Sequence, residues 1–208
     1  MTDHTGRMPG TPDDIYFRCQ GIYPDQLEGV YLIRGCEVNI VGYDGALDLP
    51  DSILDDLDWV IASFHDVVID PADTQSHTRA WLRIAENPLV DVIGHSGNGL
   101  FPFEKELVIR AFAKYGKIVE INAHSFISRP GSAENCAVIA RLCAEYRVPV
   151  VICSDAHFHR KVGYFDPAVK MLEEIGFPEE LILNADAVRF ARVLSEKSGR
   201  IFDLAEDP

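Results

Sequence analysis

The feature that most constrains the fold is a recurrence of apolar, β-branched runs separated by segments with helical periodicity. The runs read VYLIRGCEVNIV from Val30, DWVIASFH from Asp58, VDVIGHSG from Val90, KIVEINAHSF from Lys117 and VPVVICSDAH from Val148. Helical patterns lie between and after them, over residues 73–86, 102–115, 132–146, 166–175 and 185–197. Strands that alternate with helices in this way form βα units, so we expect an α/β protein with a parallel sheet.

Local signals refine this expectation. Pro102 is typical of the first position of a helix, and Gly116 is typical of the residue that ends one. The segment YDGALDLP, residues 43–50, has Asp-Gly between short extended pieces, which predicts a hairpin turn. Residues 1–26 are rich in Gly, Pro and Asp and lack a strong period, so they are predicted to form a long loop.

Length and charge narrow the class of protein. A chain of 208 residues, 47% hydrophobic, can bury one good core, so a single domain over residues 1–208 is expected. The net charge of -14 disfavours nucleic acid and anionic membranes as partners. No apolar run approaches the roughly 18 residues that span a bilayer, and nothing resembles a signal peptide. Five cysteines without close pairs fit a reducing compartment, which predicts a cytoplasmic protein.

A thiol active site is one interpretation of VICSDAHFHR, and the spacing argues against it. Cysteine phosphatases hold Cys and Arg six positions apart in their phosphate loop, whereas Cys153 and Arg160 are seven apart. Cys153 also lies within an apolar run, as a small buried hydrophobe does. Cys136 and Cys143, seven apart on a predicted helix, are expected in the core. Phosphate-loop, dinucleotide and serine-elbow motifs are absent too, which leaves metal-activated water as the nucleophile.

Ionisable or amide side chains close each apolar run. The first such groups are His4, Glu37, His65, His95, Asn122 with His124, and Asp155 with His157. Their separations are 33, 28, 30, 27 and 33 residues, about one βα unit each. The groups would therefore converge at the carboxyl edge of a parallel sheet, where α/β active sites form. A single histidine at a strand end is more often structural, but histidines repeated with carboxylates match a catalytic metal site.

The remaining candidates are weaker. Arg129 and Arg160 follow strands and could contact an anionic substrate, although solvated loop arginines are the simpler interpretation. His77 lies among polar residues of a predicted helix and is expected on the surface. His159 is expected in a loop.

With these residues identified, the chain resembles the PHP metallohydrolases, named for polymerase and histidinol phosphatase. The matching motifs cover nearly all of the chain: TDH at residues 2–4, RGCEVNI around Glu37, LDWVIASFH ending at His65, VIGHSGN around His95, VEINAHSF, SDAH at residues 154–157, and LILNADAVRFARVL. Within the family, the chain is most similar to small stand-alone phosphatases with a trinuclear, usually zinc, centre. The resemblance implies a distorted (β/α)7 barrel.

Carried over by position, the resemblance makes Glu37 a bridge between two metals, with His65 and His95 as further ligands of the second. Asp155 would bind the first metal, and His4 with His157 the third. Glu37, His65 and His95 would then form the catalytic group, with Arg129, Arg160 and His124 as candidates for substrate binding. Zinc, or manganese as an alternative, with up to three ions in a complete member, would activate a hydroxide that attacks phosphorus.

One departure from the family pattern concerns the start of the chain. The family opens with a strand that carries His-x-His, and no residue before the TDH motif supplies it. The sequence therefore predicts an N-terminally incomplete PHP domain, a barrel without its first strand and helix. A reading frame that extends upstream of Met1 is the favoured explanation, and a genuinely shortened protein that has adapted is the alternative. An incomplete barrel exposes strand edges, so self-association into a homo-oligomer is expected.

The resulting functional hypothesis is a metal-dependent phosphatase that acts on a small phosphorylated substrate, a phosphomonoester. The alternatives are a phosphodiesterase or exonuclease-like PHP protein, which the acidic charge disfavours, and a metal-binding but inactive fragment.

Overall fold

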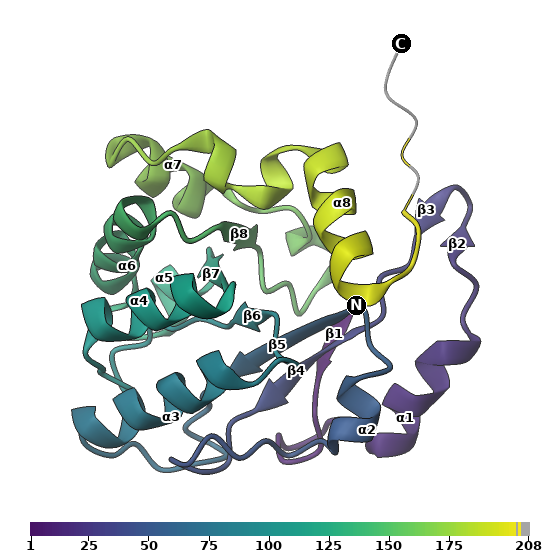
Figure 1. Cartoon of the computed structure of the whole chain (residues 1–208), viewed down its shortest axis with the longest axis horizontal. Coiled ribbons are helices and arrows are strands. Elements are labelled where there is room, and N and C mark those ends of the chain that lie inside the picture. Colours follow the sequence, from purple (N-terminus) through teal and green to yellow (C-terminus); the bar gives the residue numbers. More distant parts are fainter. Residues whose placement is uncertain (203, 205–208) are drawn as a thin grey trace.

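The computed structural model describes residues 1–202 and 204. Its centre is a parallel sheet with the strand order β1-β4-β5-β6-β7-β8 (Figure 1). The six strands are β1 (Thr2–His4), β4 (Gly35–Asn39), β5 (Trp59–Ser63), β6 (Val92–Ile93), β7 (Ile118–Asn122) and β8 (Val150–Cys153). A separate antiparallel pair, β2 (Gln26–Leu27) and β3 (Val30–Tyr31), lies in the β1–β4 connection. The expected α/β architecture with a parallel sheet is confirmed.

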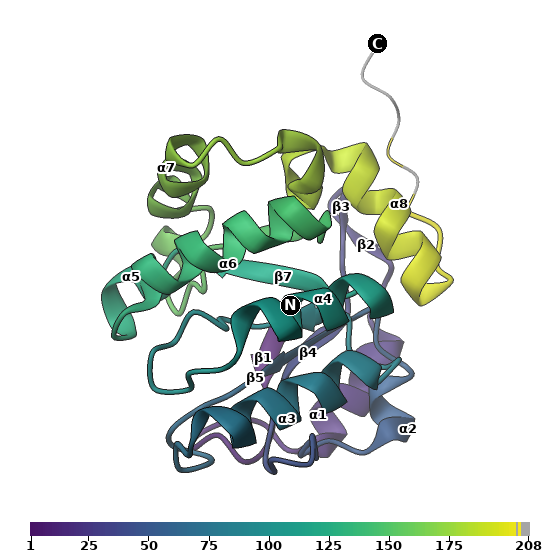
Figure 2. The ribbon, with the colours of Figure 1, turned by 60° about the vertical axis from the view of Figure 1, so that its left-hand side comes forward.

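Helices connect the strands. They are α1 (Asp14–Cys19), α2 (Asp51–Leu54), α3 (Thr74–Glu86), α4 (Lys105–Tyr115), α5 (Ser125–Ser128), α6 (Ser132–Tyr146), α7 (Asp166–Glu174) and α8 (Ala187–Ser198). Short 3-10 turns are η1 (Gln20–Ile22), η2 (His159–Lys161), η3 (Glu179–Leu181) and η4 (Leu183–Ala185). Helices α3, α4 and α6 lie side by side against one face of the sheet (Figures 1 and 2).

The period of two along each strand sorts side chains between the two faces of the sheet. In β5, Val60 and Ala62 pack into the larger apolar cluster beneath α3, α4 and α6, which includes Trp81. Trp59 and Ile61 point to the opposite face and belong to a smaller cluster with residues of α8. Because every strand adds to the same side of its predecessor, the sheet curls into a half-barrel with its inner face partly covered by α8.

Most predicted helices are confirmed within two residues, including 73–86 and 132–146. The helix predicted from Pro102 begins three residues later, at Lys105. Phe101 and Phe103 explain the delay, because both side chains are buried on either side of Pro102 and hold this stretch outside the helix.

The prediction that residues 1–26 form a long loop is wrong for two parts of that segment. Thr2–His4 pairs in parallel with Gly35–Glu37 as β1. Helix α1 starts after Asp13, whose side chain accepts the Ile15 N–H, and Phe17 is buried beneath it. One N-cap and one buried aromatic residue are enough for so short a helix when tertiary packing supports it.

The predicted hairpin turn is confirmed. Ile40 and Leu47 form an antiparallel bridge, and the Val41 N–H donates to the Ala46 carbonyl at 2.8 Å. Gly45 lies within the turn at a φ of +84°, which favours glycine. This turn matters for the site because it brings Asp48 back beside β4.

Two further observations concern surfaces. Within the described residues, every helix is too short or too polar to cross a lipid bilayer. β1 and β8 are the edges of the described sheet, with Val150 of β8 bridging in parallel to Ile182. The expected self-association therefore stays a prediction, which an exposed edge at β1 supports.

Candidate metal centre

The inner face of the half-barrel carries the candidate site, and strand parity explains which side chains reach it. Along each parallel strand, every second side chain points inward. The inward set at the carboxyl ends comprises His4, Glu37, Asn39, His65, Glu120, Asn122 and Asp155. His4 and Glu37 are direct neighbours in the β1–β4 register. The sequence interval of about one βα unit therefore does bring these groups together.

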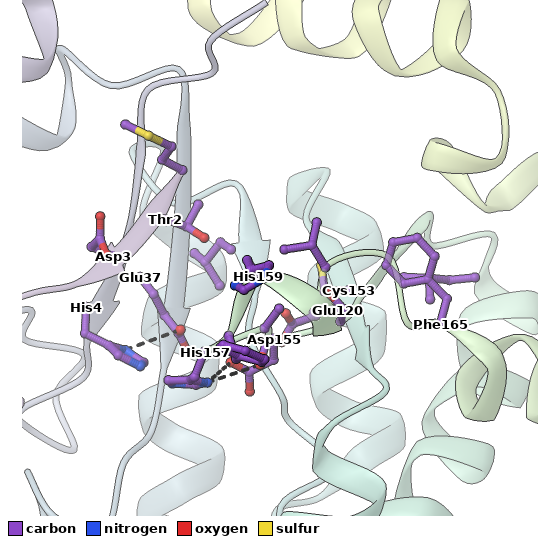
Figure 3. Close-up of a pocket in the computed structure, with 17 residues that line it drawn as sticks. Thr2, Asp3, His4, Glu37, Glu120, Cys153, Asp155, His157, His159 and Phe165 are labelled. Carbon is purple, nitrogen blue, oxygen red and sulfur yellow. Dashed lines mark hydrogen bonds and ion pairs between the residues drawn. The ribbon is translucent and has the colours of Figure 1, made fainter. Parts of the chain in front are cut away.

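Glu37 is the centre of the group. His65 Nε2 lies 3.3 Å and His95 Nε2 lies 3.1 Å from Glu37 Oε1. The two imidazole nitrogens are themselves 3.0 Å apart. His4 Nδ1 approaches the other carboxylate oxygen at 3.3 Å, as Figure 3 shows from the side of β1. Three imidazoles from three different strand ends thus surround a single carboxylate.

Charge and burial oppose one another here. Burial tends to raise the pKa of Glu37, but its contacts with His65 and His95 outweigh burial and hold the pKa well below the usual range. Burial lowers the pKa of His95 and of His4, in each case against the attraction of Glu37. The carboxyl group is therefore an anion at neutral pH, and these two histidines favour the neutral form that binds metals.

The chemistry of this donor set fits a divalent cation. Glu37 Oε1 and His4 Nδ1 are buried atoms without a hydrogen-bond partner of good geometry among the described residues. Ligand atoms of His4, Glu37 and His65 all lie within 4.8 Å of one another. Imidazole nitrogens and a carboxylate oxygen are the ligands that zinc takes in catalytic sites. A cation placed among them would supply the partner that these buried atoms lack.

A second cluster follows β8. Asp155 Oδ2 accepts from Asn122 Nδ2 and from Arg129 Nη1, each at 3.1 Å. The pKa of Asp155 is lowered. Burial and the nearby Glu37 act to raise this pKa, but the contacts with Arg129 and Asn122 outweigh them. His157 Nδ1 lies 3.6 Å from Asp155 Oδ1 (Figure 3). His157 is largely exposed, and its ring centroid lies 6.1 Å from that of His4.

The backbone is strained at one residue of each cluster, His95 and Asp155. His95 has a φ of +24° and Asp155 a φ of +48°, values that non-glycine residues rarely adopt. Such conformations persist where the surroundings over-determine them, and they concentrate at functional sites. Each residue lies two positions after the end of a strand, and His95 Nε2 reaches Glu37 Oε1 at 3.1 Å.

Sequence reasoning missed Glu120 as a site residue. It is buried in β7, and its Oε2 accepts the His95 N–H at 2.7 Å and Asn122 Nδ2 at 3.3 Å. Burial and the nearby Glu37 raise the pKa of Glu120 to about 7. A signal was present in the sequence, because Glu120 is the only charged residue in the strand IVEIN and shares the parity of Asn122.

Two cavities adjoin the cluster. The larger, about 950 Å³, is lined by polar groups that include His4, Glu37, Glu120, Asp155 and His157, and by apolar side chains such as Phe165. The smaller, about 400 Å³, is lined by His65, His124, Arg129, Asp155 and His157 among others. They share Asp155 and His157.

The substrate-binding candidates differ in placement. Arg129 and His124 line the smaller cavity, and the His124 ring centroid lies 6.3 Å from that of His157. Arg160 is exposed on η2 and lines neither cavity. His159 lies on the same turn and lines the larger cavity.

The surface prediction for His77 is wrong. Its side chain is fully buried, and its ring packs against Tyr43, Phe64 and Phe101. Nε2 accepts the Ala72 N–H at 2.9 Å, and Nδ1 donates to the Pro102 carbonyl at 2.8 Å. Gln75 and Arg79 lie on the exposed side of α3, whereas His77 faces the segment before α4.

The cysteines behave as hydrophobic residues. Cys136 and Cys143 are in the core, as predicted. Cys153 is half-buried in the wall of the larger cavity, and burial raises its pKa well above the usual value. A thiol held protonated in this way is a poor nucleophile.

Comparisons with known proteins agree with this geometry. A "Probable phosphatase" of Clostridium botulinum (strain Hall) is 42% identical over 206 residues, which cover 99% of this chain and 84% of the relative. Proteins of the same name from Acetivibrio thermocellus and Thermoanaerobacter sp. (strain X514) are 42% and 44% identical, over 97% of this chain and 83% of each relative. No protein-family model matches the chain.

A solved structure shares the fold. It is histidinol phosphate phosphatase from Lactococcus lactis, complexed with zinc, L-histidinol and phosphate. The TM-score is 0.55 at 15% sequence identity, over 85% of this chain and 81% of that chain. The fold likeness, the curated relatives and the strand-end cluster of histidines and carboxylates agree, and the chain belongs to the PHP family of phosphatases.

Proposed function

We propose that this protein is a metal-dependent phosphatase that hydrolyses a small-molecule phosphomonoester. The observation that carries the proposal is the contact of Glu37 with His65 and His95, whose three ligand atoms lie within 3.3 Å of one another. The names of the curated relatives support a phosphatase, and the zinc bound by the Lactococcus lactis protein supports the metal.

In this proposal, Glu37, His65 and His95 would hold the catalytic cation, and Glu37 would serve as a ligand of a second ion as well. His4, Asp155 and His157 hold further zinc or manganese ions. When bound, such cations make water a nucleophile at neutral pH and neutralise charge on the phosphate oxygens. Strained backbone at His95 and Asp155 marks both residues as held in place by their surroundings.

The substrate phosphate would lie against the smaller cavity. Arg129 is the one arginine in its lining, and its guanidinium is oriented by Ser125 Oγ at 2.7 Å and by Asp155. A planar guanidinium suits phosphate oxygens. His124 lies on the rim and would contact the ester side of the substrate, whereas Arg160 would reach it only if η2 moves.

The test is hydrolysis by the purified protein of p-nitrophenyl phosphate, its bis-ester and single-stranded DNA, with added zinc or manganese. We expect the monoester to be cleaved fastest and a chelator to abolish the activity. Faster cleavage of the diester or of DNA would replace the proposal with the exonuclease-like alternative. No cleavage with either metal would favour an inactive metal-binding fragment.

A further inference from the structure

A buried hydrogen-bond network lies behind His65, on the side away from Glu37. His65 Nδ1 lies 2.8 Å from Asn39 Oδ1. Asn39 and Thr5 are fully buried, and Asp48 returns to them from the hairpin turn after β4. The three residues come from different segments, so only the folded chain brings them together.

The partners of Asn39 determine which way its side-chain amide points. Nδ2 donates to Asp48 Oδ2 at 2.7 Å and to the Thr5 carbonyl at 3.1 Å. Both partners are pure acceptors. A flipped amide would place its oxygen against two acceptor oxygens in a buried site, which costs the loss of both hydrogen bonds. The amide nitrogen therefore faces Asp48, and the amide oxygen faces His65.

Asp48 is itself held in place. Its carboxylate accepts the Thr5 hydroxyl, the Arg7 N–H at 2.9 Å and the Asn39 N–H at 3.0 Å. Backbone and side-chain donors of two segments thus anchor one carboxylate. The network is fully connected, and a connected buried network specifies one arrangement.

We propose that Asn39 is a positioning residue that holds His65 in the tautomer protonated at Nδ1, so that the bare Nε2 faces Glu37. Because the Asn39 oxygen can only accept, the facing ring nitrogen must donate. A neutral imidazole carries one N–H, so the proton on Nδ1 leaves a lone pair on Nε2. That lone pair points to Glu37 Oε1 and His95 Nε2, at 3.3 and 3.0 Å.

The alternative tautomer of His65 would form a hydrogen bond within the site that competes with metal binding. With its proton on Nε2, His65 would donate to Glu37, and the two groups would form a stable internal pair that competes with a cation. The Thr5–Asn39–Asp48 network removes this option. Histidine ligands of metals commonly donate their second nitrogen in this way, and loss of the acceptor costs about 10- to 100-fold in metal affinity.

This inference rests on the proposed metal site, but its main test needs neither metal nor phosphate ester. The experiment is ¹⁵N–¹H correlation NMR of the imidazole rings in the metal-free protein, which separates the two tautomers of His65. We expect Nδ1–H in the wild type and Nε2–H in Asn39→Leu. Nε2–H in the wild type, or Nδ1–H in Asn39→Leu, would overturn the proposal.

A charge-conserving double variant separates positioning from stability. Asn39→Asp with Asp48→Asn exchanges the amide and the carboxylate, so an acceptor still faces His65 Nδ1 and a donor still joins the pair. The exchange gives up only the bond to the Thr5 carbonyl and the bond from the Arg7 N–H. Zinc affinity, measured by competition with a chromophoric chelator, should fall about 10- to 100-fold in Asn39→Leu and return toward the wild-type value in the double variant. If Asn39→Leu does not fold, the wild-type ring signals and the double variant decide the same question.

Asn184→Leu is the matched control. The Asn184 side-chain amide accepts the Ile152 N–H at 3.0 Å and donates to the Ile152 carbonyl at 2.8 Å. The variant therefore removes an amide whose partners are backbone groups, whereas the side-chain oxygen of Asn39 faces an imidazole. Equal losses of zinc affinity in Asn184→Leu and Asn39→Leu would refute a positioning role. Absence of phosphatase activity with an Nδ1–H signal intact would refute the proposed function and leave this inference standing.

Discussion

At the amino end of the sheet, Asp58 and Asp91 are buried and each carboxylate is paired with a cation. Asp58 accepts the Arg34 N–H at 2.8 Å and contacts Arg200, and Asp91 contacts Lys197 at 2.8 Å. At the carboxyl end, Glu37 has three imidazoles within 3.3 Å, and none of the described arginines or lysines forms an ion pair with it. At the amino end both carboxylates are neutralised by lysine or arginine, whereas at the carboxyl end Glu37 faces imidazole nitrogens and Asp155 pairs with Arg129.

The difference separates stability from chemistry. Paired charges at the amino end join distant parts of the chain, since Arg200 lies 142 residues from Asp58 and Lys197 lies 106 residues from Asp91. Such pairs have no spare capacity for a ligand. The carboxyl end keeps that capacity, as the ends of parallel strands do in α/β enzymes. We therefore expect mutations at the amino end to change the free energy of unfolding, and mutations at the carboxyl end to change metal binding and activity.

The largest effect is expected at Glu37. Glu37→Gln removes the anion that all three imidazoles share, so metal content and phosphatase activity should fall together by more than about 100-fold, beyond the loss typical of an outer-shell residue. Metal analysis and a monoester assay measure both. Glu145→Gln, on the exposed side of α6, is the control. Equal activity in the two variants would remove Glu37 from the centre of the site.

At the amino end of the sheet, the expected effect of mutation is a loss of stability. Arg200→Met leaves the buried Asp58 carboxylate without its guanidinium, which should lower the free energy of unfolding by about 3 kcal/mol. Arg147→Met breaks the exposed pair with Glu180 and should cost about 0–1 kcal/mol. Urea unfolding measures both. Activity per folded molecule should be unchanged in Arg200→Met, and a selective loss of activity would break the division between the two ends.

Lys117 gives the amino end a pH dependence. Burial, with Lys197 nearby, lowers its pKa from 10.5 to about 8. Between these values the unfolded chain binds more protons, so this lysine makes stability rise with pH, by about 2 kcal/mol from pH 7.5 to 9.5. Below pH 8 it is charged in both states and that gain is absent. Lys117→Met should lose the rise, and parallel slopes for the two proteins would contradict the prediction.

The smallest effect concerns thiols. Cys153 lies in the cavity wall but its pKa is raised by burial, whereas Cys19 is exposed. A thiol reagent at pH 7.5 should label Cys19 first and Cys153 slowly, because the thiolate is the reactive form. Mass spectrometry after partial labelling locates the sites. Fast labelling of Cys153 would reopen the thiol interpretation of the site.

Much of the site was predictable because it depends on strand geometry. His4, Glu37, His65, His95 and Asp155 lie in or just after β1, β4, β5, β6 and β8, and parallel strands bring their carboxyl ends to one edge. Glu120 has the same parity, but it lies inside an apolar strand and not at its end, so the strand-end pattern does not identify it.

Other features depended on packing that no local pattern reports. His77 has polar neighbours in sequence, yet the contact of α3 with the segment around Phe101 buries it. Pro102 is a good first residue for a helix, yet burial of Phe101 and Phe103 on either side delays the helix to Lys105. In both cases buried aromatic contacts outweighed local propensity.

The alternation of strands and helices and the set of groups at the carboxyl edge can be predicted from the amino-acid pattern, because both follow from periodicity along the chain. The orientation of those groups depends on tertiary contacts. Asn39 faces His65 because Thr5 and Asp48, 34 and 9 residues away, hold its amide, and Asp155 meets Arg129 through the connection after β7. Hydrogen-bond direction depends on the positions of both partners, and those positions exist only once the sheet has curled.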